Sequence, residues 1–408
     1  MSYLNLTEQF AWKIAGVTHF GVGTVSMTGD VVKSLGVKNK VLVVTDKGME
    51  DTGLIENVTN PLEEANIDFE IWDGCEPEPT RESMEKGASE GSKSKPEAVV
   101  AFGGGSVIDS AKVIAQLIAL GGEVNDYLPN AAFPQKGLPI VAVPTTSGTG
   151  AETTAYSVVA TEMEGSNYYA KAFFADPNIV PDAAIVDPML TVSMPRELTA
   201  ATGLDALAHC VGSSYTALSN PFTRAVSLQG IRLISKYLRR AVAYPDDLEA
   251  RINMSYASFI GGAGIQIAGA GEDHALGHVL GSIYKMPHGQ ACGLALPSTM
   301  EYNVLHNSEQ MADIAVAMGE DIAGLTPREA AYKAIESVTT LINDVGFSYA
   351  LKDYENADKN ALPVVADWLH SNPWVVPVYQ FWTKRTVSKE DAETIAENTW
   401  EGKFGEPF

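Results

Sequence analysis

Short apolar runs alternate with amphipathic segments along the first 190 or so residues. The runs KVLVVTD (40–46), DFEIWDG (68–74), AVVAFGGG (98–105) and PIVAVPTT (139–146) are rich in β-branched residues and end in Gly, Pro or Asp, as strands do. The segment 106–120 carries apolar residues at the spacing of one helical face. This alternation predicts a doubly wound, mainly parallel α/β sheet with ligands at the carboxyl ends of its strands.

The pattern changes after PDAAIVDPML (181–190), where strand signals nearly vanish and long Ala-, Leu- and Ile-rich helical patterns begin. We therefore expect two domains, an α/β domain over residues 1–190 and an all-α domain over residues 191–408. A chain of 408 residues is long enough for two such domains.

The net charge and the cysteine content limit which partners and which cellular compartment we expect. The chain has 28 basic and 51 acidic residues, a formal net charge of −23, which disfavours nucleic acid and anionic membranes as partners. Its three cysteines, Cys75, Cys210 and Cys292, lie far apart and form no disulfide or CxxC pattern. With no apparent signal peptide and no membrane-length apolar run, we expect a cytoplasmic protein.

Two loops that follow predicted strands have the composition of phosphate-binding loops. In the first, three glycines lead into Ser106 and a helix, whose free N–H groups and partial positive charge suit a pyrophosphate. The second, PTTSGTGAETT (144–154), is dense in hydroxyls and glycines. A tight structural turn and a solvated loop are the alternatives, but both loops should face one crevice, which favours binding.

Asp46 ends the strand-like run 40–46. A carboxylate there can accept hydrogen bonds from a ribose diol and repel a 2′-phosphate, which favours NAD over NADP. The alternative is an ordinary helix cap, and the neighbouring Lys47 would weaken the repulsion.

Histidines and one aspartate recur at helical spacing in the second half of the chain. Asp205 and His209 are four residues apart, as are His274 and His278, so each pair shares a helical face. His288 follows a proline and should begin a new segment. Together these five residues offer more ligands than a catalytic metal with an open position requires, so one histidine is left for another task.

These motifs together resemble the iron-containing (group III) alcohol dehydrogenase family. FGVGTV, GGGSVIDSAK, PTTSGTGAE, PDAAIVDP, ATGLDALAH and HALGHVLG…PHG stand in the family's order and separations, from residue 20 to about residue 302. The resemblance implies a dinucleotide-binding domain (1–190), a helical metal-binding catalytic domain (191–408), and an active site between them. It implies Asp205, His209, His274 and His288 as metal ligands, with His278 near substrate and cofactor.

The same resemblance assigns cofactor contacts. Asp46 matches the position that favours NAD, two loops match the family's cofactor loops, and a lysine matches one near the nicotinamide-side ribose and phosphate. The loop residues and the lysine are Gly104, Gly105, Ser106, Thr145, Thr146, Thr149 and Lys171.

The expected function is a metal-dependent, NAD(H)-linked alcohol dehydrogenase or aldehyde reductase. Its substrate would be a small primary alcohol or aldehyde, including anionic ones such as succinic semialdehyde or sulfoacetaldehyde. We expect Fe²⁺, with Zn²⁺ as the alternative because N and O ligands bind it more tightly. His278 is our candidate proton relay. A homodimer or higher homo-oligomer is also expected.

Other readings remain open. A glycerol dehydrogenase-type polyol enzyme is similar, but the Asp/His/His/His set fits the iron group better. A dehydroquinate synthase-like lyase would need basic residues, and segments 201–213 and 269–281 contain no Lys or Arg. A metal-binding subunit without catalysis is the non-enzymatic alternative.

Two features depart from the resemblance. Glu272 and Asp273 precede His274 where relatives are usually apolar. The C-terminal aromatics Trp374, Tyr379 and Trp382 could line the substrate pocket or pack at a subunit contact.

Overall fold

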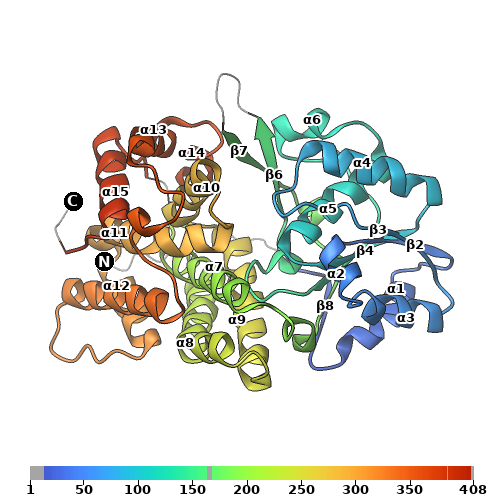
Figure 1. Ribbon diagram of the computed structural model, residues 1–408, viewed down its shortest axis with the longest axis horizontal. Helices are drawn as coiled ribbons and strands as arrows, with labels where there is room; N and C mark the ends of the chain where they lie inside the picture. Colours follow the sequence, from blue (N-terminus) through green and yellow to red (C-terminus); the bar gives the residue numbers. More distant parts are fainter. Residues whose placement is uncertain (1–12, 163–167, 384, 406–408) are drawn as a thin grey trace.

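The computed structural model describes residues 13–162, 168–383 and 385–405 and arranges them as two adjacent domains (Figure 1). One contains a parallel sheet between helices, and the other is built from helices. This arrangement confirms the predicted fold class. The last sheet strand ends at Val186 and the first long helix begins at Arg196. The predicted boundary near residue 190 lies in this link and stays a prediction.

The sheet has six strands in the order β1-β8-β5-β4-β2-β3, and all neighbours are parallel. The four strands expected from the sequence are β2 to β5, and each ends two residues before its predicted limit. Strands β1 and β8 had not been predicted. The six strands are β1 (Val17–Phe20), β2 (Lys40–Val44), β3 (Asp68–Trp72), β4 (Ala98–Gly103), β5 (Ile140–Pro144) and β8 (Ala183–Val186).

Helices cover both faces of the sheet, which explains why its inner strands are apolar throughout. Leu42 and Val44 face the core beneath α4 and α5, whereas Val41 and Val43 face the core beneath α1 and α3. In Figure 1, α4 lies above the strands and α1 and α3 lie below them. The helices of this domain are α1 (Thr28–Ser34), α2 (Lys47–Asp51), α3 (Glu56–Glu64), α4 (Arg81–Gly91), α5 (Gly105–Leu120) and α6 (Val124–Tyr127).

An antiparallel hairpin joins the two domains. Its strands are β6 (Tyr156–Glu162) and β7 (Tyr169–Ala175). Phe174 is buried in the sheet-domain core, while the neighbouring Phe173 packs against a core of the helical domain. The hairpin thus contributes alternate side chains to both domains.

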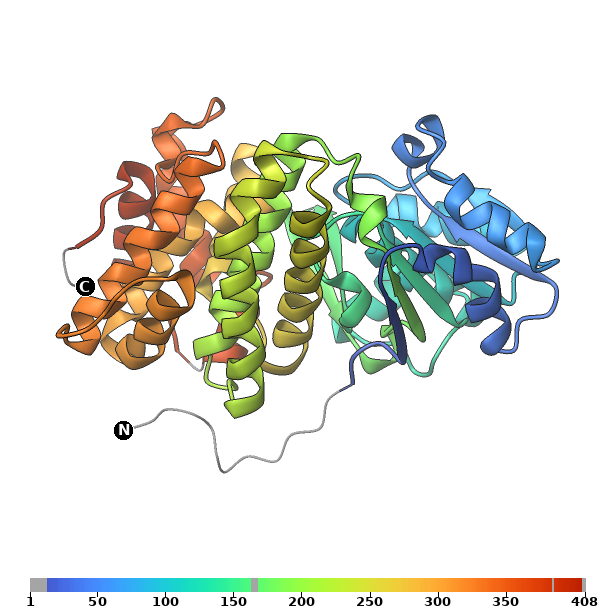
Figure 2. The same cartoon turned by 90° about the horizontal axis from the view of Figure 1, so that it is seen from below.

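The helical domain contains two apolar cores. One lies among α7, α8, α9, α11 and α12, and the other among α10, α11, α13, α14 and α15. Figure 2 shows α7, α8 and α9 of the first group standing between the sheet domain and the remaining helices. No helix in the described ranges is long and apolar enough to cross a membrane. The helices are α7 (Arg196–Tyr215), α8 (Pro221–Ala243), α9 (Leu248–Ala268), α10 (Glu272–Tyr284), α11 (His288–Met318), α12 (Pro327–Asp344), α13 (Leu362–Ser371), α14 (Val376–Thr383) and α15 (Lys389–Glu401).

Candidate active site

A cleft of about 740 Å³ is lined by residues of both domains. All the side chains and glycines that the sequence singles out for cofactor, metal or proton transfer lie on its wall, although they are spread over more than 240 positions of the chain. They are Asp46, Gly104, Gly105, Ser106, Thr145, Thr146, Thr149, Lys171, Asp205, His209, His274, His278 and His288.

The two predicted cofactor loops pack directly on each other at the carboxyl ends of β4 and β5. A Cβ atom added at Gly105 would lie 2.5 Å from Cγ2 of Thr149, so a side chain there would collide with the second loop. Helix α5 starts at Gly105 with no side-chain cap, which leaves its first N–H groups for a ligand. The Ser106 hydroxyl donates to the carbonyl of Pro77 (2.6 Å) and so ties the loop to the segment after β3.

Asp46 is a helix cap that also lies on the cleft wall, and its role toward a ribose stays a prediction. Its side chain caps α2 by accepting a hydrogen bond from the Met49 N–H (3.2 Å), and it also lines the cleft. Lys47, the first residue of α2, lines the cleft beside it.

On the helical-domain side of the cleft, three imidazoles surround one carboxylate oxygen. Oδ1 of Asp205 lies 3.8 Å from Nε2 of His209, 3.8 Å from Nε2 of His274 and 3.7 Å from Nε2 of His288. Asp205 and His209 are one turn apart on α7, and the other two come from α10 and from the first residue of α11. A Cβ atom at Gly289 would lie 2.2 Å from the carbonyl oxygen of Ala201, so only glycine lets α11 begin against α7.

The donor atoms fit a divalent metal ion. Oδ1 of Asp205 and Nε2 of His274 are buried and have no hydrogen-bond partner, an arrangement that is costly unless something else binds them. Separations of 3.7–3.8 Å are too long for hydrogen bonds. Two ligands that each lie about 2 Å from one ion are separated by roughly 3–4 Å. One carboxylate and three imidazoles suit iron or zinc.

Cys292 is a buried neighbour of these ligands that the sequence analysis did not identify. Ligand atoms of Cys292, Asp205, His274 and His288 all lie within 4.8 Å of one another. The sequence feature that could have identified Cys292 is its position one helical turn after His288. Its Sγ lies 3.7 Å from both ring nitrogens of His288 and hence beside the ring. Two ligand sets therefore compete, with His209 or Cys292 as the fourth member.

Burial and neighbouring charge separate the protonation states of the histidines. Burial lowers the pKa of His209 to about 4. Burial and the nearby Lys171 hold the pKa values of His278 and His288 well below their usual range. Burial also lowers the pKa of His274, but Cys292 and Asp273 outweigh it and hold that pKa well above its usual value. His278 is therefore neutral near pH 7 and able to accept a proton.

The remaining cleft wall is mostly apolar.

The three C-terminal aromatics, whose role the sequence left open, lie in three different environments. Trp382 lines the cleft with its indole against Gly269, where an added Cβ would lie 2.0 Å from Cδ2. Tyr379 is buried in the second helical core, and Trp374 packs against the sheet-domain core.

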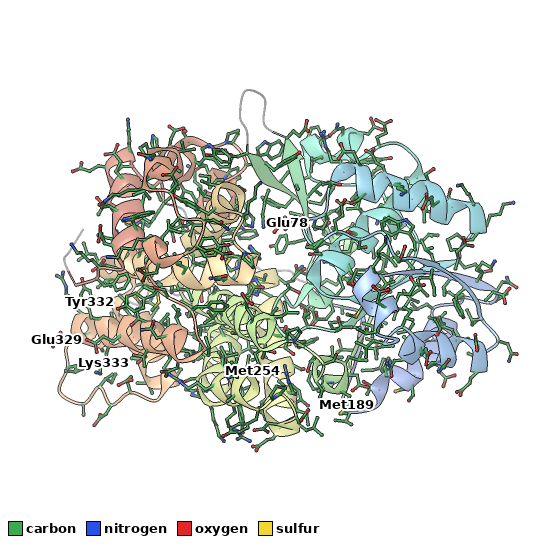
Figure 3. The ribbon with its side chains drawn as sticks, in the orientation of Figure 1. Glu78, Met189, Met254, Glu329, Tyr332 and Lys333 are labelled. Atoms are coloured by element: carbon green, nitrogen blue, oxygen red, sulfur yellow. The ribbon has the colours of Figure 1, made fainter. Side chains whose placement is uncertain are left out.

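One ion pair on the cleft wall links the β6–β7 hairpin to the segment after β3. The ammonium group of Lys171, on β7, donates to the carboxylate of Glu78 at 2.9 Å. Figure 3 shows Glu78 in the region where the sheet domain, the hairpin and the helical domain meet.

Comparison with known proteins agrees with this geometry. Residues 16–188 match the family model described as iron-containing alcohol dehydrogenase, and residues 199–398 match the C-terminal model of the same family. The 1,3-propanediol dehydrogenase of Klebsiella pneumoniae is 38% identical over 86% of this chain and 89% of its own length. The NAD-dependent methanol dehydrogenase of Bacillus methanolicus is 36% identical over 88% and 94%. The crystal structure of sulfoacetaldehyde reductase from Bifidobacterium kashiwanohense in complex with NAD⁺ has a TM-score of 0.83, 27% identity, and coverage of 96% of this chain and 99% of that one. The chain thus belongs to the iron-containing alcohol dehydrogenase family and is an oxidoreductase.

Proposed function

We propose that this enzyme uses NAD(H) and divalent iron to interconvert small, uncharged primary alcohols or diols with their aldehydes. One observation carries the proposal. Three imidazole Nε2 atoms surround an unpartnered Asp205 oxygen in the same cleft that the glycine and threonine loops line. A metal centre and a dinucleotide loop that share one cleft suit hydride transfer to or from an oxygen-bearing carbon.

The proposed metal ligands are Asp205, His209, His274 and His288. When bound there, the ion would supply Lewis acidity toward the substrate oxygen. The four side chains fix its position because three of them are almost wholly buried and each comes from a helix packed in the core. Bound NAD(H) would supply or accept the hydride, and the protein would supply alignment.

The cofactor's position follows from the loops. The uncapped N–H groups at the start of α5 would bind the pyrophosphate, with the Thr149 loop packed against them. Asp46 would accept hydrogen bonds from the adenine-side ribose and disfavour a 2′-phosphate. Both relatives of known cofactor preference described above, from B. methanolicus and B. kashiwanohense, use NAD or bind NAD⁺.

The charges around the cleft favour a neutral substrate over an anionic one. Among the described residues that line it, Lys47 and Lys171 are the only Lys or Arg side chains. Lys47 adjoins Asp46 at the cofactor end, and Lys171 already binds Glu78. The helical wall near α14 instead carries Ile265, Val378 and Trp382. A carboxylate or sulfonate would find no unpaired cation there, and the polyanion of a dehydroquinate synthase-like reaction is disfavoured for the same reason.

His278 would move the proton. It shares a face of α10 with His274, and its Nδ1 is buried with no partner. Its ring centroid lies 5.3 Å from that of His288, next to the proposed metal centre. The lowered pKa keeps the ring neutral, so it can take the alcohol proton directly or through a cofactor hydroxyl.

The test is an aldehyde panel on metal-free, Fe²⁺-loaded and Zn²⁺-loaded protein, with NADH and with NADPH. We expect kcat/KM for acetaldehyde and lactaldehyde to exceed that for succinic semialdehyde by at least about tenfold. NADH should be preferred, and 1,3-propanediol should be oxidised with NAD⁺. Turnover by metal-free protein, or a preference for the anionic aldehyde, would contradict the proposal.

We also expect a cytoplasmic homo-oligomer. Cys75, Cys210 and Cys292 are free and buried, which fits a reducing compartment. Light scattering during size-exclusion chromatography tests the oligomer, because a monomer at micromolar concentration would contradict it.

A further inference from the structure

Two fully buried carboxylates begin helix α10, immediately before His274. Glu272 and Asp273 both have 0% of their surface exposed. Burying a carboxylate costs several kcal/mol unless hydrogen bonds or opposite charges compensate it, as a rule of thumb. Each of the two therefore needs a partner, and the two partners differ.

Asp273 binds the ring of the histidine that follows it. Its Oδ2 lies 2.5 Å from Nδ1 of His274. A carboxylate accepts at this position, so Nδ1 keeps its proton and Nε2 is the nitrogen left to bind a metal. That Nε2 is the buried, unpartnered atom 3.8 Å from Oδ1 of Asp205. The contact with Asp273 thus favours the tautomer of His274 in which Nε2 can bind the proposed ion.

The other two imidazoles around Asp205 lack such a partner in the described part of the chain. Nδ1 of His209 is buried without a hydrogen bond, and Nδ1 of His288 has only the Cys292 thiol, at 3.7 Å. Of the three imidazoles around Asp205, His274 is the one whose Nδ1 forms a hydrogen bond with a carboxylate. Removing that carboxylate should therefore affect metal binding through His274 alone.

Glu272 faces a different part of the molecule. Its Oε2 accepts a hydrogen bond from Nδ2 of Asn303 on α11 (2.9 Å). Oδ1 of Asn303 in turn accepts one from the guanidinium of Arg385 (2.9 Å), which lies 4.1 Å from the ring centre of Tyr302. Glu272 thus ties α10 to α11 and to the segment after α14. It serves as a natural control, equally buried and one residue further from His274.

We propose that Asp273 is a positioning residue that orients His274, keeps its Nδ1 protonated and strengthens metal binding at Nε2. This inference rests on the proposed metal centre. A carboxylate that accepts from a ligand imidazole raises the basicity of the opposite nitrogen and fixes the ring's rotation. The result would be tighter metal retention than three unsupported imidazoles give.

The first test measures Zn²⁺ affinity by competition with a chromophoric chelator, on wild-type, Asp273→Asn, Glu272→Gln and His274→Ala proteins. We expect Asp273→Asn to bind Zn²⁺ about 10- to 100-fold more weakly, since loss of such a partner typically costs that much. Glu272→Gln should stay within a few-fold of wild type. Circular dichroism and the melting temperature of the metal-free proteins verify folding. Equal affinity of folded Asp273→Asn and wild type would overturn the inference.

The second test is read on wild type, and a variant is needed only to assign one signal. Long-range ¹H–¹⁵N correlation spectra of Zn²⁺-loaded wild type, labelled at histidine, report which nitrogen of each ring carries the proton. The His274 signal is assigned from its absence in His274→Gln. Protonated Nδ1 with metal-bound Nε2 supports the inference, and the reverse overturns it.

The two levels of failure are distinguishable. If wild type binds no Zn²⁺, or His274→Ala binds it equally well, the proposed metal centre fails and this inference fails with it. If His274→Ala loses the ion while Asp273→Asn keeps full affinity, only the role of Asp273 is wrong.

Discussion

The Lys171 ammonium lies 2.9 Å from the Glu78 carboxylate and connects the β6–β7 hairpin to the segment after β3. Lys171 is nearly buried, with 7% of its side chain exposed, whereas half of the Glu78 side chain is exposed. If Lys171 contacts the cofactor as the family resemblance implies, Glu78 competes for it. Glu78→Gln should then lower KM for NADH by about two- to fivefold, the scale of an exposed ion pair.

Steady-state kinetics at low and at high salt check this expectation. Glu76→Gln is the matched control because Glu76 also lines the cleft but accepts from Thr80 instead of a lysine. A higher KM for NADH in Glu78→Gln, or the same change in both variants, would show that Glu78 does not compete with the cofactor for Lys171.

His278 should matter for rate and not for metal content. His278→Gln or His278→Ala is expected to retain the metal and to lose about 10²- to 10⁴-fold in kcat, the usual range for a proton-transfer group. Because the pKa of His278 is held well below 6.5, the acid limb that it causes should lie below pH 6.5 and vanish in the variants. Metal analysis and a pH profile of kcat provide the readout. Loss of the ion would instead make His278 a ligand.

Trp382 should limit the length of the substrate. Its indole packs between Gly269 and Tyr156, with ring centroids 6.2 Å apart in an edge-on contact with the tyrosine. Trp382→Ala would open this end of the cleft, so kcat/KM for hexanal relative to acetaldehyde should rise by about tenfold. Tyr244→Ala is the control, since Tyr244 is 68% exposed and does not line the cleft. An unchanged ratio in Trp382→Ala would place the substrate elsewhere in the cleft.

Cys292 and His209 compete for the fourth ligand position, and cobalt distinguishes them. A cobalt–thiolate bond produces a strong near-ultraviolet charge-transfer band, which an Asp/His/His/His site lacks. We expect no such band in Co²⁺-loaded wild type. His209→Ala should weaken Zn²⁺ binding by more than about 100-fold, and Cys292→Ser by less than about tenfold. A thiolate band that disappears in Cys292→Ser would reverse the assignment.

Glu152 should make stability depend on pH. It is 2% exposed, and burial raises its pKa from 4.5 to about 7. Its folded-state pKa is therefore above its unfolded value, so the proton favours the folded protein. This contribution is complete below pH 4.5 and is lost as the pH rises to about 7. The loss corresponds to about 3 kcal/mol.

Glu152→Gln removes this dependence. The variant and wild type should have similar free energies of unfolding near pH 4.5 and differ most above pH 7, where the variant is more stable. Denaturant unfolding at several pH values measures the difference. Glu64→Gln, at an exposed position, is the control. A constant difference between wild type and Glu152→Gln across this range would show that Glu152 ionises normally.

Much of the sheet domain was predictable because its inner strands are buried on both faces. Continuous apolar runs such as the one in segment 98–105 predict such strands. The glycine and hydroxyl residues that follow them predict the loops. Strand β8 was missed although it is buried, since Ala183 and Ala184 carry little β-strand signal. The β6–β7 hairpin was missed because Phe173 and Phe174 face different domains, which blurs the alternation of a half-buried strand.

The site was predictable where ligands share a helical face and not where they meet across helices. The spacing of Asp205 and His209 put both on α7. Asp205 also faces His274 and His288. This contact depends on how α10 and α11 pack against α7, and the spacing of residues within one helix does not determine that packing. Asp273 directly precedes His274, and Cys292 lies four residues after His288. Their contacts with the histidine rings nevertheless depend on side-chain directions that only the assembled structure gives.

An ion held by Asp205, His274 and His288 would fasten three separate helices, α7, α10 and α11, to one another. Ligand binding stabilises only the part of a protein that holds the ligand, so the metal would stabilise the helical domain, whereas the sheet domain supplies no ligand to it. Withdrawing the metal would therefore lower the melting temperature of the helical domain more than that of the sheet domain. Iron supply and NAD supply would then set the lifetimes of two different halves of one enzyme.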